Sequence, residues 1–231
     1  MTLVYPVLRY RKSYNDEGSA VHTIQAGPRR TFVAGLLHTP EERFMAIRTF
    51  AFCDGQYLST VISKIVQTQI SIDFGLLINH LLRPDEELIR TYYYDALPYL
   101  SQTPTPEDTE RVTRKNNFFR KLEALEGFEV HQGRTESRGT DAAGKGIFIQ
   151  KQVDVLLAVD ILLSTFRQAA DRIILVAGDS DYIPVVREAK AAGAIVRLIH
   201  GPDHTFHKEL WQACDWRREL TLQDINTASR K

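Results

Sequence analysis

Residues 173–181 read IILVAGDSD, and this stretch decides how the rest of the chain is interpreted. An apolar, β-branched run of strand length stops at a glycine and is followed by Asp179 and Asp181. Residues 182–190 (YIPVVREAK) are typical of a helix. Because ligands of α/β proteins collect at the carboxyl ends of buried strands, these carboxylates are suited to a hard cation such as Mg²⁺ or Mn²⁺. Capping of the helix by Asp179 is the alternative, and it explains one aspartate better than two.

Two further segments place carboxylates at the ends of apolar elements. Residues 49–55 (TFAFCDG) are typical of a short strand that ends at Asp54. Residues 151–163 (KQVDVLLAVDILL) indicate an apolar helix with Asp154 in its first turn and Asp160 six residues later. An aspartate in a first turn complements the helix dipole, whereas one inside an apolar helix is costly to bury without a partner. So many carboxylates at element ends exceed what capping requires.

The order and spacing of four motifs resemble those of NYN domains, which are PIN-like ribonuclease domains, and in particular their LabA-like branch. The motifs are FCDG at 52–55, YYYDA at 92–96, KQVD at 151–154 with Asp160, and GDSDY at 178–182. The resemblance covers roughly residues 49–216, and its specific part is the Lys-x-Val-Asp helix followed by the strand and Gly-Asp-Ser-Asp. One departure is Tyr57, which stands where members usually have an asparagine, and it puts in doubt a polar contact to metal-bound water or substrate.

The resemblance implies a metal-dependent ribonuclease, in the first place an endonuclease, that hydrolyses RNA with Mg²⁺ or Mn²⁺. A divalent cation would relieve repulsion among clustered carboxylates and orient a water against the scissile phosphorus. The residues expected as metal ligands or water positioners, and so as catalytic residues, are Asp54, Asp154, Asp179 and Asp181. Asp160 is expected either to belong to this site or to have a structural role. In the structural role its partner would be Lys151 or the neighbouring backbone. Asp95, at the end of another strand, is assigned a rim or structural role.

The composition bears on the partner and on the cellular location that are expected for the protein. The 231 residues contain 29 basic and 29 acidic side chains, so attraction to nucleic acid must be local. Two cysteines do not make a disulfide framework, and no apolar run spans a membrane or has the form of a signal peptide. A cytoplasmic protein with RNA as its partner and no membrane association is therefore expected, with a homodimer left open.

A locally basic segment indicates where RNA is expected to bind. Residues 111–151 hold nine Lys or Arg against five Asp or Glu. A glycine-rich loop before the Asp154 helix is expected to contact RNA phosphates. Such contacts would position an RNA strand without reading its sequence. The expected substrate-binding residues are Arg134, Arg138, Lys145 and Lys151. The basic residues on the preceding helix, such as Arg114 and Lys121, are interpreted as an ordinary solvated face.

The chain is expected to fold as a three-layer α/β/α domain with a mainly parallel central sheet. Apolar strands alternate with helices along the chain, and helical crossovers join parallel strands. The expected divisions are an N-terminal extension at 1–47, the nuclease-like domain at 48–220 and a tail at 221–231. The extension is interpreted as either an added β-rich element or a partly disordered arm.

Two other classes of function stay open at this stage. A catalytically weak RNA-binding or regulatory protein would keep the fold, and Tyr57 raises this alternative. A small-molecule phosphatase or nucleotide hydrolase would also use aspartates at strand ends. It would need an Asp-x-Asp after the first strand, and Asp54-Gly55-Gln56 lacks the second aspartate.

Overall fold

The computed structural model describes residues 8–14, 20–26, 46–68, 70–141 and 146–229, and it divides the chain into two compact units at residues 44 and 45. In the first unit, β1 (Leu8–Tyr14) and β2 (Ala20–Ala26) form an antiparallel pair. Within the described residues, no helix is both long and apolar enough to cross a bilayer.

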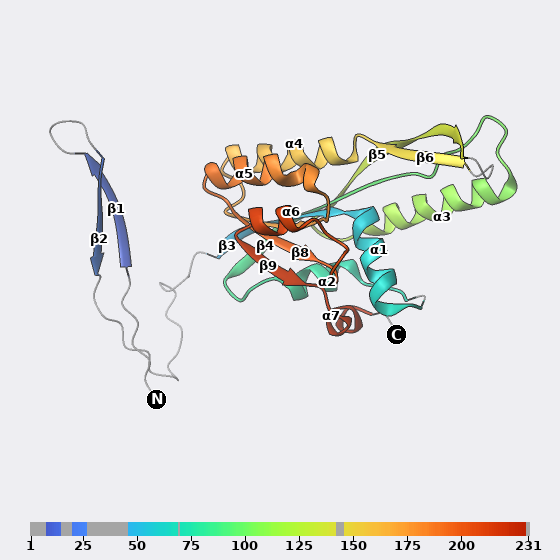
Figure 1. The fold of residues 1–231 in the computed structure, drawn as a ribbon. Coiled ribbons are helices and arrows are strands. Elements are labelled where there is room, and N and C mark those ends of the chain that lie inside the picture. The colour runs from blue at the N-terminus through green and yellow to red at the C-terminus, as the bar shows by residue number, and fades with distance from the viewer. Residues whose placement is uncertain (1–7, 15–19, 27–45, 69, 142–145, 230–231) are drawn as a thin grey trace. The chain divides into compact units, whose positions relative to one another are not determined.

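The second unit is built on a seven-stranded sheet with the strand order β6-β5-β4-β3-β7-β8-β9 (Figure 1). Every neighbouring pair is parallel except β5 and β6. The strands are β3 (Ile47–Asp54), β4 (Glu86–Ala96), β5 (Phe128–Thr140), β6 (Gly146–Lys151), β7 (Arg172–Val176), β8 (Ile195–His200) and β9 (Trp216–Glu219). This confirms the expected α/β class with a mainly parallel sheet.

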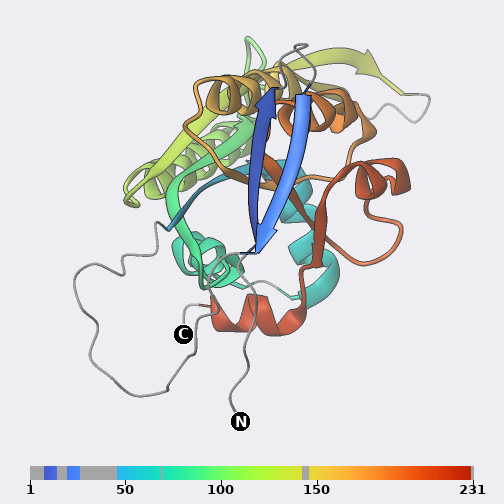
Figure 2. The ribbon, with the colours of Figure 1, turned by 90° about the vertical axis from the view of Figure 1, so that its left-hand side faces the viewer.

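Helices cover both faces of the sheet, as Figures 1 and 2 show from two directions. The helices are α1 (Gly55–Val66), α2 (Phe74–Leu81), α3 (Pro106–Glu123), α4 (Val153–Phe166), α5 (Ile183–Ala191), α6 (Lys208–Ala213) and α7 (Leu222–Thr227). Alternate residues of a strand point to opposite faces, so Phe52 packs with α4 and α5 while Cys53 packs with α1 and α2. The two apolar clusters complete the three-layer arrangement.

The connections place the ends of β3 and β7 at a topological switch point. From β3 the chain passes through α1 and α2 to β4, whereas from β7 it passes through α5 on the other face to β8. The connections therefore leave these two neighbouring strands in opposite directions. In open α/β sheets, a crevice for ligands forms at the carboxyl ends of such strands.

The expectation of a glycine-rich loop after residue 133 is wrong for residues 133–140. These residues continue β5, and they pair antiparallel with β6 so that Arg134 lies opposite Lys151. The β-branched and aromatic run Ile147–Phe148–Ile149 favours this strand pairing. Gly133 permits the close approach of the two segments, because a Cβ there would lie 2.4 Å from the Lys151 carbonyl oxygen.

The start of α4 and the presence of α7 differ from the sequence expectation. Lys151 was expected in the helix of Asp154, but it is the last residue of β6. Gln152 follows with a left-handed backbone (φ 74°), which separates the strand from α4. Near the other end of the chain, α7 lies in the segment expected as a tail, and its Ile225 is buried in the cluster under α1 and α2.

Candidate functional site

The carboxylates of Asp54 and Asp154 meet at the hydroxyl group of Tyr182. Asp54 ends β3, Asp154 lies in the first turn of α4, and Tyr182 ends the short 3₁₀ turn after β7. The Tyr182 hydroxyl donates to Asp154 Oδ1 at 2.7 Å and lies 3.4 Å from Asp54 Oδ2. Burial raises the pKa of Tyr182, and the charges of Asp54, Asp154 and Asp179 raise it further. The hydroxyl therefore keeps its proton and links the two acids.

Asp54 is held in an environment that disfavours its negative charge. It is the N-cap of α1, and its Oδ1 accepts a hydrogen bond from the Tyr57 backbone N–H at 2.9 Å. Burial is the main cause that raises the pKa of Asp54 to about 6, and the charges of Asp154 and Asp95 add to it. A divalent cation beside Asp54 and Asp154 would remove this penalty, because it favours the ionised form of both groups.

Asp179 and Asp181 lie on the exposed turn that follows β7. Asp179 caps this turn, and its Oδ1 accepts a hydrogen bond from the Asp181 backbone N–H at 3.1 Å. The charge of Asp179 contributes to the raised pKa of Tyr182, so it acts on the hydroxyl group that links Asp54 and Asp154. The Asp181 side chain is exposed on the same turn. The capping alternative therefore describes Asp179 correctly.

The donor chemistry of this region fits a hard cation, although a complete cage is not formed. Among the residues that the structure describes, no three or more His, Cys, Asp or Glu side chains converge as a metal site. Asp54 and Asp154 are two carboxylates that share a hydrogen-bond donor. Mg²⁺ is commonly bound by one or two carboxylates, with waters and substrate phosphates as its other ligands. A site made of the two carboxylates Asp54 and Asp154 is consistent with that mode.

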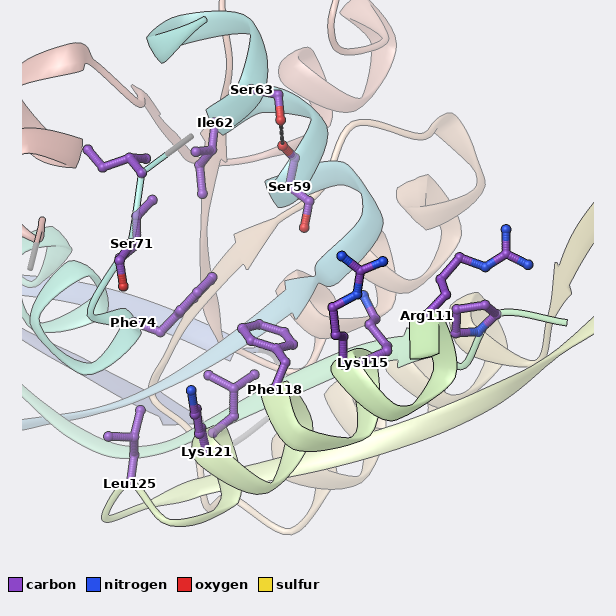
Figure 3. Close-up of a pocket in the computed structure, with 15 residues that line it drawn as sticks. Ser59, Ile62, Ser63, Ser71, Phe74, Arg111, Lys115, Phe118, Lys121 and Leu125 are labelled. Carbon is purple, nitrogen blue, oxygen red and sulfur yellow. Dashed lines mark hydrogen bonds between the residues drawn. The ribbon is translucent and has the colours of Figure 1, made fainter. Parts of the chain in front are cut away.

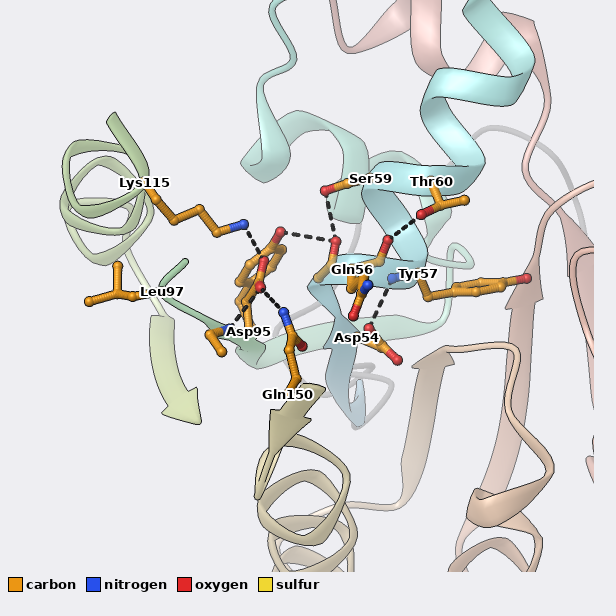
Figure 4. A network of polar contacts seen from close by, with 12 residues as sticks. Asp54, Gln56, Tyr57, Ser59, Thr60, Asp95, Leu97, Lys115 and Gln150 are labelled. Carbon is orange, nitrogen blue, oxygen red and sulfur yellow. Dashed lines mark hydrogen bonds and ion pairs between the residues drawn. The ribbon is translucent and has the colours of Figure 1, made fainter. Parts of the chain in front are cut away.

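Asp95 is a buried carboxylate with its own cationic partner. Lys115 of α3 pairs with Asp95 Oδ2, and the Gln150 side chain donates to Oδ1 at 3.3 Å (Figure 4). The Ala96 backbone N–H also donates to Oδ1, at 2.7 Å. Because Asp95 adds to the raised pKa of Asp54, the two strand ends are electrostatically linked. Sequence analysis did not identify Lys115 as this partner, since the pair joins residues of different elements.

Asp160 is bound on the sheet side of α4 by two groups that the sequence did not indicate. The Tyr94 hydroxyl donates to Asp160 Oδ2 at 2.9 Å, and His131 Nδ1 lies 2.7 Å from the same oxygen. These contacts favour the structural role for Asp160, because they supply the partners that a buried carboxylate needs.

Tyr57 does not present its side chain to the carboxylates. Figure 4 shows the ring directed away from Asp54, and its hydroxyl accepts a hydrogen bond from the Gly201 backbone N–H at 3.0 Å. The ring also occupies the space beside Gly178, where a Cβ would lie 2.2 Å from Tyr57 Cε2. Tyr57 therefore holds the loop after β8 against the end of β7, and only its backbone reaches Asp54.

The expected substrate-binding residues lie on the β5–β6 hairpin, so far as they are described. Arg134 and Arg138 are exposed on β5, and both approach Glu136, at 3.3 and 3.6 Å. Lys151 is half-buried at the end of β6, whereas Lys145 lies outside the described residues. One carboxylate thus partly offsets the charges of the two arginines.

Comparisons with known proteins agree with this architecture. The model of the NYN domain matches residues 48–220. A search of curated proteins found no match. Among solved structures, the chain is similar to a protein of unknown function from Vibrio parahaemolyticus, with 17% identity and a TM-score of 0.55. That match covers 82% of this chain and 99% of the other, and at this identity it supports the fold alone.

Proposed function

The chain belongs to the NYN domain family, which has a PIN-like nuclease fold, and we propose that it is a metal-dependent endoribonuclease. The observation that carries the proposal is the meeting of Asp54 and Asp154 at the Tyr182 hydroxyl, beside the switch point of the sheet. These two carboxylates come from distant parts of the sequence, and capping explains only the contact that Asp54 makes with α1.

In this proposal Asp54 and Asp154 hold Mg²⁺ or Mn²⁺, and the exposed Asp179 and Asp181 bind the same ion or position water. The bound ion would supply an activated water and stabilise charge on the phosphate oxygens. Tyr182 keeps the two carboxylates in one orientation through its hydroxyl group. Arg134, Arg138, Lys145 and Lys151 are proposed to contact RNA phosphates, which would position the strand without reading its sequence.

The test is cleavage of labelled RNA by Asp179→Asn, compared with the unmutated protein in Mg²⁺, Mn²⁺ or EDTA. Asparagine keeps the size of aspartate and still caps the turn, so a purely structural role predicts little change. Loss of a hard ligand predicts that cleavage falls below detection while RNA binding persists. Glu188→Gln, which removes one exposed carboxylate from α5, serves as the matched control. Cleavage by Asp179→Asn at the unmutated rate would remove Asp179 from the proposed site.

The second candidate is an RNA-binding protein of this fold with little activity. Two observations favour it: the Tyr57 side chain is directed away from Asp54, and the described carboxylates do not form a site of three or more ligands. This candidate predicts metal-independent RNA binding and no cleavage by the unmutated protein under any metal condition. The same assay therefore separates the two candidates.

A further inference from the structure

A groove of about 590 Å³ lies between α1, α3 and the segment that leads into α2 (Figure 3). One wall is cationic, and all of its basic residues come from α3. They are Arg111, Arg114, Lys115 and Lys121. At the helical period of 3.6 residues, positions 111, 114, 115 and 121 fall on one face of α3. The face that the sequence suggested was merely solvated therefore borders an open groove.

The cations of this wall differ in how firmly they are held. Lys115 is bound to the buried Asp95, whereas Arg111 pairs with Asp108 at 2.9 Å and Arg114 approaches Glu110 at 3.8 Å. Such exposed pairs within one helix contribute little to stability. Arg111 and Arg114 can therefore exchange these partners for a phosphate at little cost.

The floor of the groove is apolar and partly aromatic. Phe118 lies half-buried between the cations, with its ring centroid 5.5 Å from that of Phe74 and 5.7 Å from that of Tyr93. Ile70 and Ile72 line the same space. A cationic wall beside an apolar floor matches single-stranded nucleic acid, because phosphates bind to cations while bases pack on aromatic and apolar side chains.

The groove adjoins the carboxylate site through Asp95. A second hollow contains Asp95, Gln56 and Gln150, and it shares residues with the groove. The shared residues are Ser59, Pro98, Arg111 and Lys115. Gln56, which also lines this second hollow, lies in the first turn of α1, two residues after Asp54. A strand at Asp54 can thus continue past Asp95 and Lys115 into the groove.

We propose that this groove binds the part of a single-stranded RNA that extends away from the phosphate at Asp54. The inference rests on the proposed function for the position of that phosphate, and it adds a binding surface that is separate from the β5–β6 hairpin. From Arg111 to Lys121 the helix rises about 15 Å, which is long enough to contact more than one phosphate of an extended strand.

The test measures binding of a labelled oligouridylate that is long enough to cover the groove, and of a labelled dinucleotide, both in EDTA. In the groove variant, Arg111, Arg114 and Lys121 are each replaced by glutamine. Lys115 is kept because its loss would leave the buried Asp95 unpaired. The control variant replaces Arg120, Arg187 and Lys208, which are exposed and lie outside the groove, with glutamine. Thermal unfolding of each variant verifies that it is folded.

The groove variant should bind the oligouridylate at least tenfold more weakly, while its dinucleotide binding is unchanged. The slope of log affinity against log salt should fall by about 2, at roughly 0.7 for each phosphate contact to a single strand. A variant that keeps positive charge (Arg111→Lys, Arg114→Lys, Lys121→Arg) should retain most of the affinity. Equal losses in the groove and control variants, or an unchanged salt slope, would overturn the inference.

The outcome for the groove can be distinguished from the outcome for catalysis. If the unmutated protein cleaves no RNA but the groove variant loses oligouridylate binding, the proposed ribonuclease function fails and the groove assignment stands. If the unmutated protein cleaves RNA and the groove variant binds and cleaves the oligouridylate normally, the strand takes another path, and the β5–β6 hairpin is then the surface to test.

Discussion

Two neighbouring parallel strands, β3 and β4, both carry an aspartate at the carboxyl end, but the two carboxylates have opposite electrostatic surroundings. Asp95 is buried at the end of β4 and is paired with Lys115 of α3. Asp54 at the end of β3 faces Asp154 of α4 across the Tyr182 hydroxyl, and its pKa is raised to about 6. The helix that packs over each strand end thus decides whether its carboxylate meets a cationic side chain, as Asp95 does, or a second carboxylate, as Asp54 does.

The largest expected effect is on cleavage by Asp54→Asn. Asparagine still caps α1, so the fold should be intact. Because the substitution removes one of the two carboxylates that are proposed to hold the metal, Mg²⁺-dependent cleavage should fall by at least about a hundredfold. Single-turnover cleavage at saturating Mg²⁺ measures this effect. Full activity in Asp54→Asn would show that Asp54 is not a metal ligand.

The next effect is on stability, and it tests the other strand end. Lys115→Met leaves the buried Asp95 without its cation, and loss of one partner of such a pair costs about 3–5 kcal/mol when it is fully buried. Lys115 is 26% exposed, so we expect a loss of about 2–4 kcal/mol in urea unfolding. The double variant Lys115→Met with Asp95→Asn should recover part of this loss. If the double variant is less stable than Lys115→Met, the charge on Asp95 is not the cause.

The smallest effect is a pH-dependent gain of stability in metal-free Asp54→Asn. Near pH 3 the Asp54 carboxyl is protonated in both the folded and the unfolded chain. As pH rises past the ordinary value of 3.8, the unfolded chain releases this proton first, so the folded state loses stability until about pH 6. Asparagine cannot ionise and avoids this loss.

The difference in unfolding free energy between Asp54→Asn and the unmutated protein should therefore grow between pH 4 and pH 6 and stay constant above it. Two pKa units correspond to about 3 kcal/mol, and partial solvent access reduces the expected gain to about 1–3 kcal/mol. Urea unfolding in EDTA across this pH range measures it. A difference that does not change with pH would show that Asp54 ionises in the folded protein as it does in water. Asp95→Asn should instead lower the stability, because it removes the partner of Lys115.

Local patterns in the sequence were sufficient for the central strands, for most of the helices and for much of the architecture. The apolar runs that end at Asp54 and at Gly178 form the adjacent strands β3 and β7, and the apolar run after Gln152 forms α4. The alternation of strands and helices predicted a mainly parallel sheet, and the resemblance to NYN domains is confirmed over residues 48–220. These features follow from hydrophobic period and from the chemistry of element ends, and both are properties of consecutive residues.

Only the tertiary structure decided which partner each polar group meets. Lys115 reaches Asp95 because α3 packs over the end of β4, and Tyr182 lies between Asp54 and Asp154 because three separate elements end at one edge of the sheet. The pairing of β5 with β6 likewise converts an expected loop into a hairpin. Such contacts depend on the packing of side chains from distant segments, and no local pattern encodes that packing. For this reason the sequence determined where the carboxylates lie along the chain, and the packing of the helices determined which of the described carboxylates meet a cationic side chain.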